Sequence, residues 1–179
     1  MKVKLIVGLV SVMVVFGSCN SEPSLQKYFV ESTDNKNFVA LDISPSILNI
    51  DKQKLTIEQN EALKTFDKMN LLAFKRNDTN TADYEAEKIK VKEILKRNKY
   101  QELMKFSRDG DAASVSFVGD ENHIDEFVLF ADKKEEGFAI VRILGKDMNP
   151  TSIMTMMSVL QASNIDMEQL KPLREMIAK

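Results

Sequence analysis

The chain of 179 residues is 44% hydrophobic and has a formal net charge of −2, from 25 basic and 27 acidic side chains. This length fits one domain with a sizeable core, and the near balance of charge, without a basic face or aromatic–basic interleaving, argues against a nucleic-acid partner. Cys19 is the single cysteine and His123 the single histidine, which excludes an internal disulfide and any site built on several histidines.

The N-terminal residues predict an export signal that ends at Cys19. Two lysines precede an apolar run over residues 5–16, and Gly17 and Ser18 are small residues directly before the cysteine. The run is shorter than the roughly 20 residues of a membrane-spanning helix, and its order is typical of a secretory signal peptide. It resembles a bacterial lipobox, in which the cysteine receives a diacylglyceryl group and becomes the first residue after cleavage. A plain signal peptide with an incidental cysteine is the alternative.

This resemblance divides the chain into a signal peptide (residues 1–18), a lipidated tether (19–23) and a single domain (24–179). It implies a membrane anchor through the lipid on Cys19, because each buried methylene of an acyl chain contributes about 0.8 kcal/mol. Cleavage removes two lysines, which shifts the net charge to about −4, and lipidation leaves no free thiol. Asn20 stands where an aspartate would retain the protein in the inner membrane. We therefore expect an outer-membrane lipoprotein of the bacterial envelope that faces the periplasm, with surface exposure left open.

In the first half of the domain, helices alternate with strands. Ser24 and a Thr56/Gln59 capping box mark helix starts, and period-two apolar positions mark the first strand. The expected elements are a short helix over 24–30, a strand over 38–43, a helical turn after Pro45 through Leu48, a helix from Ile57 to about Lys68, a buried strand over 71–74 and a charged helix from Asn80 or Thr81 to about Asn98. The buried stripe expected for the helix at 57–68 is Ala62, Leu63, Phe66 and Met69.

In the second half, the apolar period changes to two. Strands are expected over 103–106, 113–118, 124–130 and 138–144, joined by turn-rich connectors. Asn149-Pro150 starts a helix to about Ala162, and Asp166 with Gln169 suggests the cap of a last helix, which Pro172 splits or kinks. The order β-α-β-α-β-β-β-α indicates an α+β domain with a mostly antiparallel sheet of about five strands and helices packed on one face. The strand order stays open.

Several segments after Cys19 are distinctive, namely residues 24–30, 39–44, 100–104, 108–111, 124–130 and 137–147. Together they resemble a family of small Bacteroidetes-type lipoproteins catalogued as a domain of unknown function. The resemblance covers nearly the whole mature chain and rests on strands and turns. It implies a bacterial envelope lipoprotein and brings no activity, cofactor or site residue.

Candidate chemical residues are few. His123 lies in a turn near Asp125, where it could act as a base or a metal ligand, although a solvated turn residue is the commoner case. Acidic pairs could bind calcium or perform acid–base hydrolysis, but turn chemistry and sheet-edge charge also explain them: Asp109/Asp111, Asp120/Glu121 and Asp125/Glu126. The chain lacks a Gly-x-Ser-x-Gly elbow and a Gly-rich phosphate loop.

Two other features have a structural and a functional interpretation. Methionines cluster near the C-terminus and could ligate Cu(I), although core packing is the better explanation: Met148, Met154, Met156, Met157 and Met167. The strands at 124–130 and 138–144 are apolar on both faces, so one layer of helices would leave apolar surface for a partner. Cover by the helix at 24–30 or by the C-terminal helix is the favoured alternative.

We therefore expect a non-enzymatic interaction or sensing domain at the membrane surface. Cys19 is the one functional residue predicted, and no catalytic, cofactor-binding or metal-binding residue is predicted. Its partners would be the membrane, through the lipid, and an envelope protein. A hydrolase that uses acidic turn residues and a protein that handles metal through methionines remain the alternatives.

Overall fold

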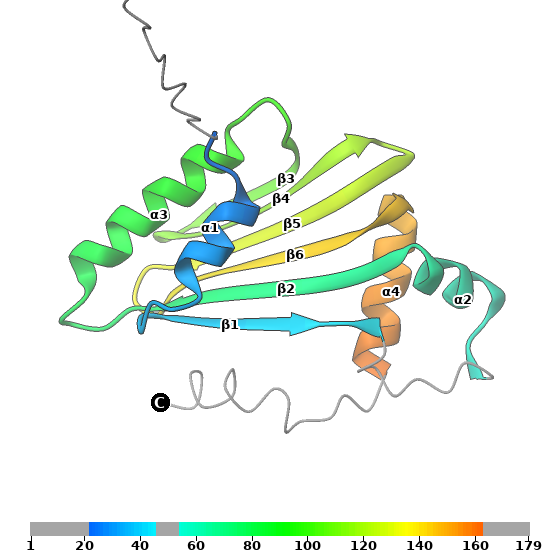
Figure 1. The fold of residues 1–179 in the computed structure, drawn as a ribbon, viewed down its shortest axis with the longest axis horizontal. Coiled ribbons are helices and arrows are strands. Elements are labelled where there is room, and N and C mark those ends of the chain that lie inside the picture. Colours follow the sequence, from blue (N-terminus) through cyan, green and yellow to red (C-terminus); the bar gives the residue numbers. More distant parts are fainter. Residues whose placement is uncertain (1–21, 46–53, 163–179) are drawn as a thin grey trace, which may run out of the picture.

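The computed structural model describes residues 22–45 and 54–162, in which six strands form one open antiparallel sheet (Figure 1). The strands lie in the order β1-β2-β6-β5-β4-β3 and are β1 (Phe38–Ile43), β2 (Phe66–Lys75), β3 (Gln101–Arg108), β4 (Asp111–Asp120), β5 (His123–Lys133) and β6 (Gly137–Met148). The helices in the same ranges are α1 (Leu25–Ser32), α2 (Ile57–Lys64), α3 (Thr81–Leu95) and α4 (Pro150–Ala162). The predicted α+β class is confirmed. Cys19, the turn through Leu48 and the last helix expected after Asp166 lie outside the described residues.

The expected total of about five strands is one too low, because the described residues form six, although each of the four ranges expected between residues 103 and 144 lies within one of β3 to β6. β3 pairs with β4 from Gln101 to Arg108 through a tight turn at Asp109-Gly110. Both turn residues have positive φ, 54° and 95°. Two-residue hairpin turns require this conformation, and Asp-Gly adopts it readily.

The helix expected over residues 57–68 is wrong at its C-terminal end, because α2 ends at Lys64. Its start is confirmed by the reciprocal capping box between Thr56 and Gln59. Phe66 and Met69, expected on the helix stripe, lie in β2, which pairs with both β1 and β6. A register shift between Phe66 and Lys68 places Phe66 and Met69 against the same core although they are three residues apart. This bulge imitates a helical period in the sequence.

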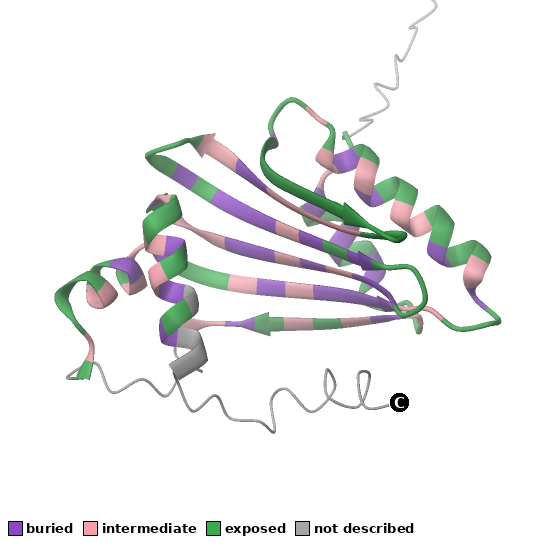
Figure 2. Ribbon diagram, turned by 180° about the vertical axis from the view of Figure 1, so that it is seen from behind, coloured by how far each residue is buried: buried purple, intermediate pink, exposed green. Residues whose placement is uncertain are grey.

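Helices cover both faces of the sheet, and not one face as expected. The front face, which carries Leu72 and Ile140, packs against α1 and α3, whereas the back face, which carries Phe127 and Ile143, packs against α4 (Figures 1 and 2). Successive side chains of a strand point to opposite faces. Since β5 and β6 are apolar at successive positions, both of their faces need cover.

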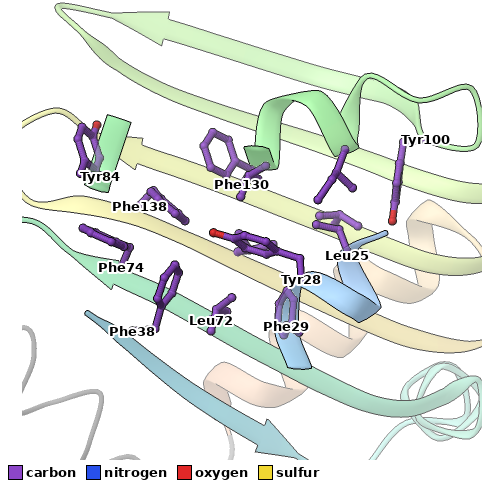
Figure 3. Packing of buried hydrophobic residues seen from close by; sticks show 14 residues of the cluster. Leu25, Tyr28, Phe29, Phe38, Leu72, Phe74, Tyr84, Tyr100, Phe130 and Phe138 are labelled. Carbon is purple, nitrogen blue, oxygen red and sulfur yellow. The ribbon is translucent and has the colours of Figure 1, made fainter. Parts of the chain in front are cut away.

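The front core is aromatic (Figure 3). Phe74 stacks on Phe138 with ring centroids 5.5 Å apart, and Phe38 meets Phe74 edge-on at 5.1 Å. These offset and edge-to-face contacts are the favoured aromatic geometries. Leu25 and Tyr28 of α1 pack on this cluster, so the helix predicted after Ser24 becomes part of the front layer.

The back core lies beneath α4 at one end of the strands. The predicted start of α4 is confirmed, because Asn149 and Ser152 each bond the other's backbone N–H through their side chains. Ile153 and Met156 are buried against the sheet. The layer that they cover is Ile43, Met69, Ile143, Phe127 and Phe117.

Candidate interaction surface

The rest of the back face consists of two rows of apolar side chains that cross all six strands. The first row lies two residues along each strand from the layer under α4. In the order of the strands across the sheet, it consists of Leu41, Leu71, Val141, Leu129, Val115 and Met104. The second row lies two residues further along each strand and consists of Val39, Ala73, Ala139, Ala131, Ala113 and Phe106. We call these the outer apolar rows. The second row contains four alanines, so its side chains are shorter than those of the first row.

Exposure along the outer apolar rows increases toward β3. Most of the residues are half-buried, Ala73 is buried at 2% exposure, and Ala131 is exposed. Met104 and Phe106, on β3, are 62% and 56% exposed. Figure 2 shows α4 across one end of the strands, with no described helix on the remainder of this face. The exposed apolar side chains of Met104 and Phe106 therefore mark the β3 end of this face as a candidate interaction site.

β3 adds an open edge to this surface. All eight of its residues are exposed, and among the described residues it pairs with β4 and with no second strand. In a two-residue hairpin the closing pair, here Arg108 and Asp111, is hydrogen-bonded, so alternation directs the backbone groups of Lys105 and Ser107 outward. An edge with free backbone donors and acceptors can accept a further strand.

A buried ion pair on the front face fixes α1 to the sheet. The Arg142 Nε donates to the Glu126 Oε1 at 2.7 Å, and their side chains are 5% and 9% exposed. Arg142 Nη1 donates to the Gln26 Oε1 at 2.9 Å, and its guanidinium lies 5.3 Å from the centre of the Phe29 ring. Both Gln26 and Phe29 belong to α1. The pair is therefore a docking element of the fold.

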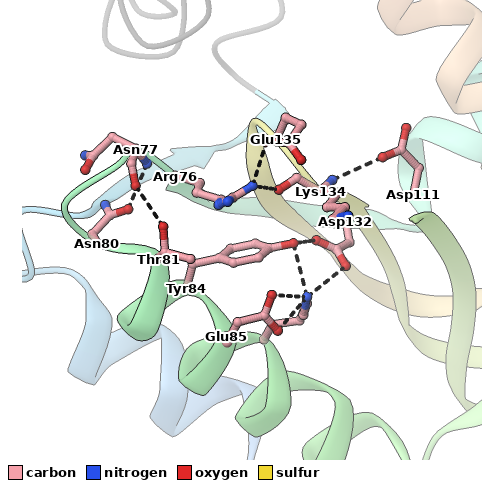
Figure 4. A network of polar contacts seen from close by, with 11 residues as sticks. Arg76, Asn77, Asn80, Thr81, Tyr84, Glu85, Asp111, Asp132, Lys134 and Glu135 are labelled. Atoms are coloured by element: carbon pink, nitrogen blue, oxygen red, sulfur yellow. Dashed lines mark hydrogen bonds and ion pairs between the residues drawn. The ribbon is translucent and has the colours of Figure 1, made fainter. Parts of the chain in front are cut away.

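A second polar cluster joins α3 to the sheet around Tyr84 (Figure 4). The Tyr84 hydroxyl donates to the buried Asp132 carboxylate, and Lys88 Nζ donates to the Tyr84 oxygen at 3.2 Å. Lys88 and Lys92 lie 3.9 and 3.8 Å from the other Asp132 oxygen. Two lysines on one side of a helix thus neutralise a carboxylate that β5 buries.

The electrostatics of this cluster do not suit proton transfer. Burial, with the hydrogen bond to Asp132, raises the pKa of Tyr84 to about 12. Burial alone would lower the pKa of Lys88, but its contacts with Glu85, Tyr84 and Asp132 outweigh this effect and raise the pKa. Catalytic acids and bases have pKa values near the working pH. Tyr84 and Lys88 therefore stay protonated and hold structure together.

The front layer encloses a hollow between α1 and α3. It measures about 230 Å³ and is lined by residues that include Pro23, Tyr28, Ile94 and Arg97. Ligand pockets measure roughly 300–1,000 Å³ and contain convergent polar groups. The hollow is smaller, and neither polar cluster opens into it.

The structure separates most of the chemical candidates from the sequence. His123 is 71% exposed, and its Nδ1 lies 2.9 Å from Asp147 Oδ1. Asp109 and Asp111 sit at the β3–β4 turn. Asp125 is exposed, whereas its neighbour Glu126 is buried with Arg142. The two carboxylates of the pair Asp125/Glu126 therefore lie in different environments and do not form one site.

The structure also separates the methionines that lie close together in the sequence. Met148 and Met156 are buried in the back core, as expected for packing, whereas Met154, for which core packing was also expected, is 71% exposed. Met167 and the side chain of Met157 lie outside the described residues.

The described residues contain no group of three or more His, Cys, Asp or Glu side chains placed to hold a metal ion. Within the same ranges, no helix has the length and apolar character needed to cross a membrane.

Sequence reasoning did not find the two buried polar clusters, because each joins residues far apart in the chain. A weak signal exists, since Arg142 and Asp132 interrupt otherwise apolar strands, and buried charges need partners. The sequence does not give the register that pairs Arg142 with Glu126.

Comparison with known proteins identifies the family. Residues 28–156 match the model of DUF4252, described as a domain of unknown function, and the chain belongs to this family. The match runs from α1 into α4 and so includes the whole sheet. No curated protein and no solved structure gives a match.

Proposed function

We propose that this protein is a lipid-anchored lipoprotein of the bacterial envelope whose domain binds a partner polypeptide along the edge strand β3. The observation that carries the proposal is the coincidence of an exposed strand edge with the exposed Met104 and Phe106 side chains. The binding mode is the addition of an extended segment to β3. Backbone hydrogen bonds supply affinity and alternate side chains supply specificity in this mode.

The charged side chains of β3 are placed so that the strand remains apolar where Met104 and Phe106 face the back of the sheet. Natural edge strands are often blunted by lysine, which prevents unwanted pairing. Lys105 pairs in register with Ser114 and so points to the front, whereas Met104 and Phe106 point to the back. Arg108, at the end of the strand, pairs with Asp109 at 3.2 Å. A partner strand with apolar side chains on its back side fits this edge.

The N-terminal geometry suits a short anchor. Glu22, at the start of the described residues, pairs with Arg97 after the C-terminal end of α3 at 2.8 Å. Two residues separate Cys19 from Glu22 in the sequence, and three residue steps span at most about 10 Å. A lipid on Cys19 would hold the domain close to the membrane surface. Its partner would then be sought in the envelope.

The geometry does not favour either of the two alternative functions, the hydrolase or the metal-handling protein. A hydrolase needs two carboxylates that converge on one substrate bond, and Asp109, Asp111 and Asp125 lie on exposed strands and turns. A methionine-based copper site needs several thioethers together, and Met148 and Met156 are buried in the core while Met154 faces solvent. We therefore retain the interaction module.

Site-specific photocrosslinking tests this function in intact cells. A photoreactive phenylalanine analogue replaces Phe106 in one strain and Val30 in another. Val30 is a matched control, since it is an exposed apolar residue of α1 on the other layer. We expect a discrete envelope-protein adduct from position 106 and none from position 30.

The Lys105→Pro variant shows whether such an adduct depends on strand addition. It removes an outward backbone N–H without breaking the β3–β4 ladder, because proline is tolerated on the free side of an edge strand. We expect the adduct at position 106 to disappear while the thermal unfolding midpoint changes little. An adduct that persists in Lys105→Pro, or equal labelling from position 30, would contradict strand addition.

A further inference from the structure

We propose that the strand added to β3 is the β3 of a second copy of this chain, paired antiparallel around a two-fold axis so that the two sheets join edge to edge. The inference rests on the proposed function, because it names the partner for the same edge. An interface of this symmetry uses the same surface on both copies, so that surface must be complementary to itself.

A β-bulge gives the front side of β3 two opposite charges. Glu102 pairs in register with Ser116, whereas Met104 pairs with Val115, so Leu103 is the extra residue of the bulge. Glu102 and Lys105 therefore point to the same side of the strand although they are three residues apart. Their carboxylate and ammonium groups lie 3.8 Å apart, and both side chains are exposed.

These charges select one antiparallel register. Because Leu103 is the extra residue, Glu102 and Lys105 lie one ladder position on either side of Met104. When the two-fold axis passes through the pair of Met104 residues, each Glu102 lies opposite Lys105 of the second copy. Opposite charges that face each other across two strands stabilise the pairing, and like charges destabilise it. A register centred on Lys105 would place two lysines face to face.

The same register brings exposed apolar side chains together on the back side. The two Met104 side chains face each other, and each Phe106 is a diagonal neighbour of Met104 in the second copy, within reach of a long side chain. Both residues are more than half exposed in the single chain. The outward backbone groups of Lys105 would at the same time gain hydrogen-bond partners.

The other edge of the described sheet lacks this self-complementarity. Strand β1 carries one charged residue, Asp42, and its carboxylate already accepts a hydrogen bond from Asn70. Two β1 strands would therefore bring no opposite charges together. Pairing of β1 with β3 would leave a free edge on each copy and build an open filament. Pairing of β3 with itself is the closed arrangement that the charges favour.

We expect this dimer to be weak and to exchange readily. Stable interfaces bury about 800 Å² on each partner, and the edge of an eight-residue strand offers less contact area than that. A lipid anchor would raise the local concentration of the two copies, but the pairing itself does not need one. A weak dimer calls for a covalent trap.

Disulfide trapping of the full chain in intact cells tests the register. In Met104→Cys the two Cα atoms would lie about 4.5 Å apart, within the range of a disulfide. Phe106→Cys is the matched control on the same side of the same strand, since its two copies would be about 13 Å apart along the strands. We expect at least about tenfold more dimer from position 104 than from position 106 or from the parent chain, which has Cys19 alone.

Charge reversal gives a second readout in the Met104→Cys background. Glu102→Lys and Lys105→Glu each place like charges across the axis and should lower the trapped dimer at least about fivefold. Co-expression of the two variants restores both opposite pairs and should restore a dimer between them. Thermal unfolding midpoints close to that of the parent chain show that each variant is folded.

Each outcome decides between the inference and the proposed function. Equal trapping from positions 104 and 106, or no recovery when the two charge variants are co-expressed, would overturn the self-pairing. A photocrosslinked adduct with another protein at position 106, without a trapped dimer at position 104, would overturn it and leave the proposed function standing. The absence of both products would overturn both.

Discussion

Replacing Arg142 by methionine tests whether the buried ion pair holds α1 on the sheet. The substitution keeps an unbranched side chain of similar length but removes the hydrogen bonds to Glu126 and Gln26, and it leaves the Glu126 carboxylate 9% exposed without its cation. Removing one partner of a buried pair costs about 3–5 kcal/mol. In a chain of this size each kcal/mol lowers the melting temperature by about 2–4 °C, so we expect a decrease of about 6–20 °C.

A double-mutant cycle separates the ion pair from the packing around it. Urea unfolding is measured for the parent chain, Arg142→Met, Glu126→Leu and the double variant. The double variant should recover much of the loss, because two apolar side chains can replace a buried pair at little cost. Additive losses in the double variant, or a loss of less than about 1 kcal/mol in Arg142→Met, would refute the assignment of Arg142 as the docking element.

Three further predictions concern tyrosine, glycine and histidine positions. The pKa of Tyr84 is raised to about 12, so the stability that its protonated hydroxyl contributes is complete below pH 10 and is lost as the pH rises toward 12. Between these pH values, the urea unfolding midpoint of Tyr84→Phe should fall less than that of the parent chain. Gly137→Ala should lower the free energy of unfolding by at least about 2 kcal/mol, since φ is 121° and a Cβ would meet the Phe74 carbonyl oxygen at 2.0 Å. In Gly110→Ala the added Cβ would meet a flexible lysine side chain, so the loss in the same denaturation assay should be smaller. His123→Ala should change stability by less than about 0.5 kcal/mol, and a larger change would show that its exposed contact with Asp147 matters.

Local sequence signals predicted the elements that are defined by local chemistry. The Thr56/Gln59 capping box and the Asn149-Pro150 start lie where the sequence predicts them. The strands β5 and β6 were predicted from apolar runs bounded by turn residues, a signal that lies within each strand and needs no knowledge of its neighbours. The α+β class followed from these elements.

Features that depend on pairing between distant strands could not be predicted. The bulge at Phe66 hides a strand behind a helical spacing, and only the register with β6 reveals it. The placement of α4 on the back face depends on which residues of β5 and β6 point there. An exposed apolar second face was one of two interpretations of the sequence, and cover by helices was the favoured one; α1 and α4 provide part of that cover. The location of the remaining surface on the outer rows and β3 needed the strand order.

Mass spectrometry of the protein purified from membranes, beside the Cys19→Ala variant, tests the envelope assignment most directly. The account predicts a chain that begins at Cys19 and carries the mass of a diacylglyceryl or triacyl modification, with the modification and the membrane association both lost in Cys19→Ala. An unmodified chain in the soluble fraction of wild-type cells would contradict the anchor and return Cys19 to the set of free thiols.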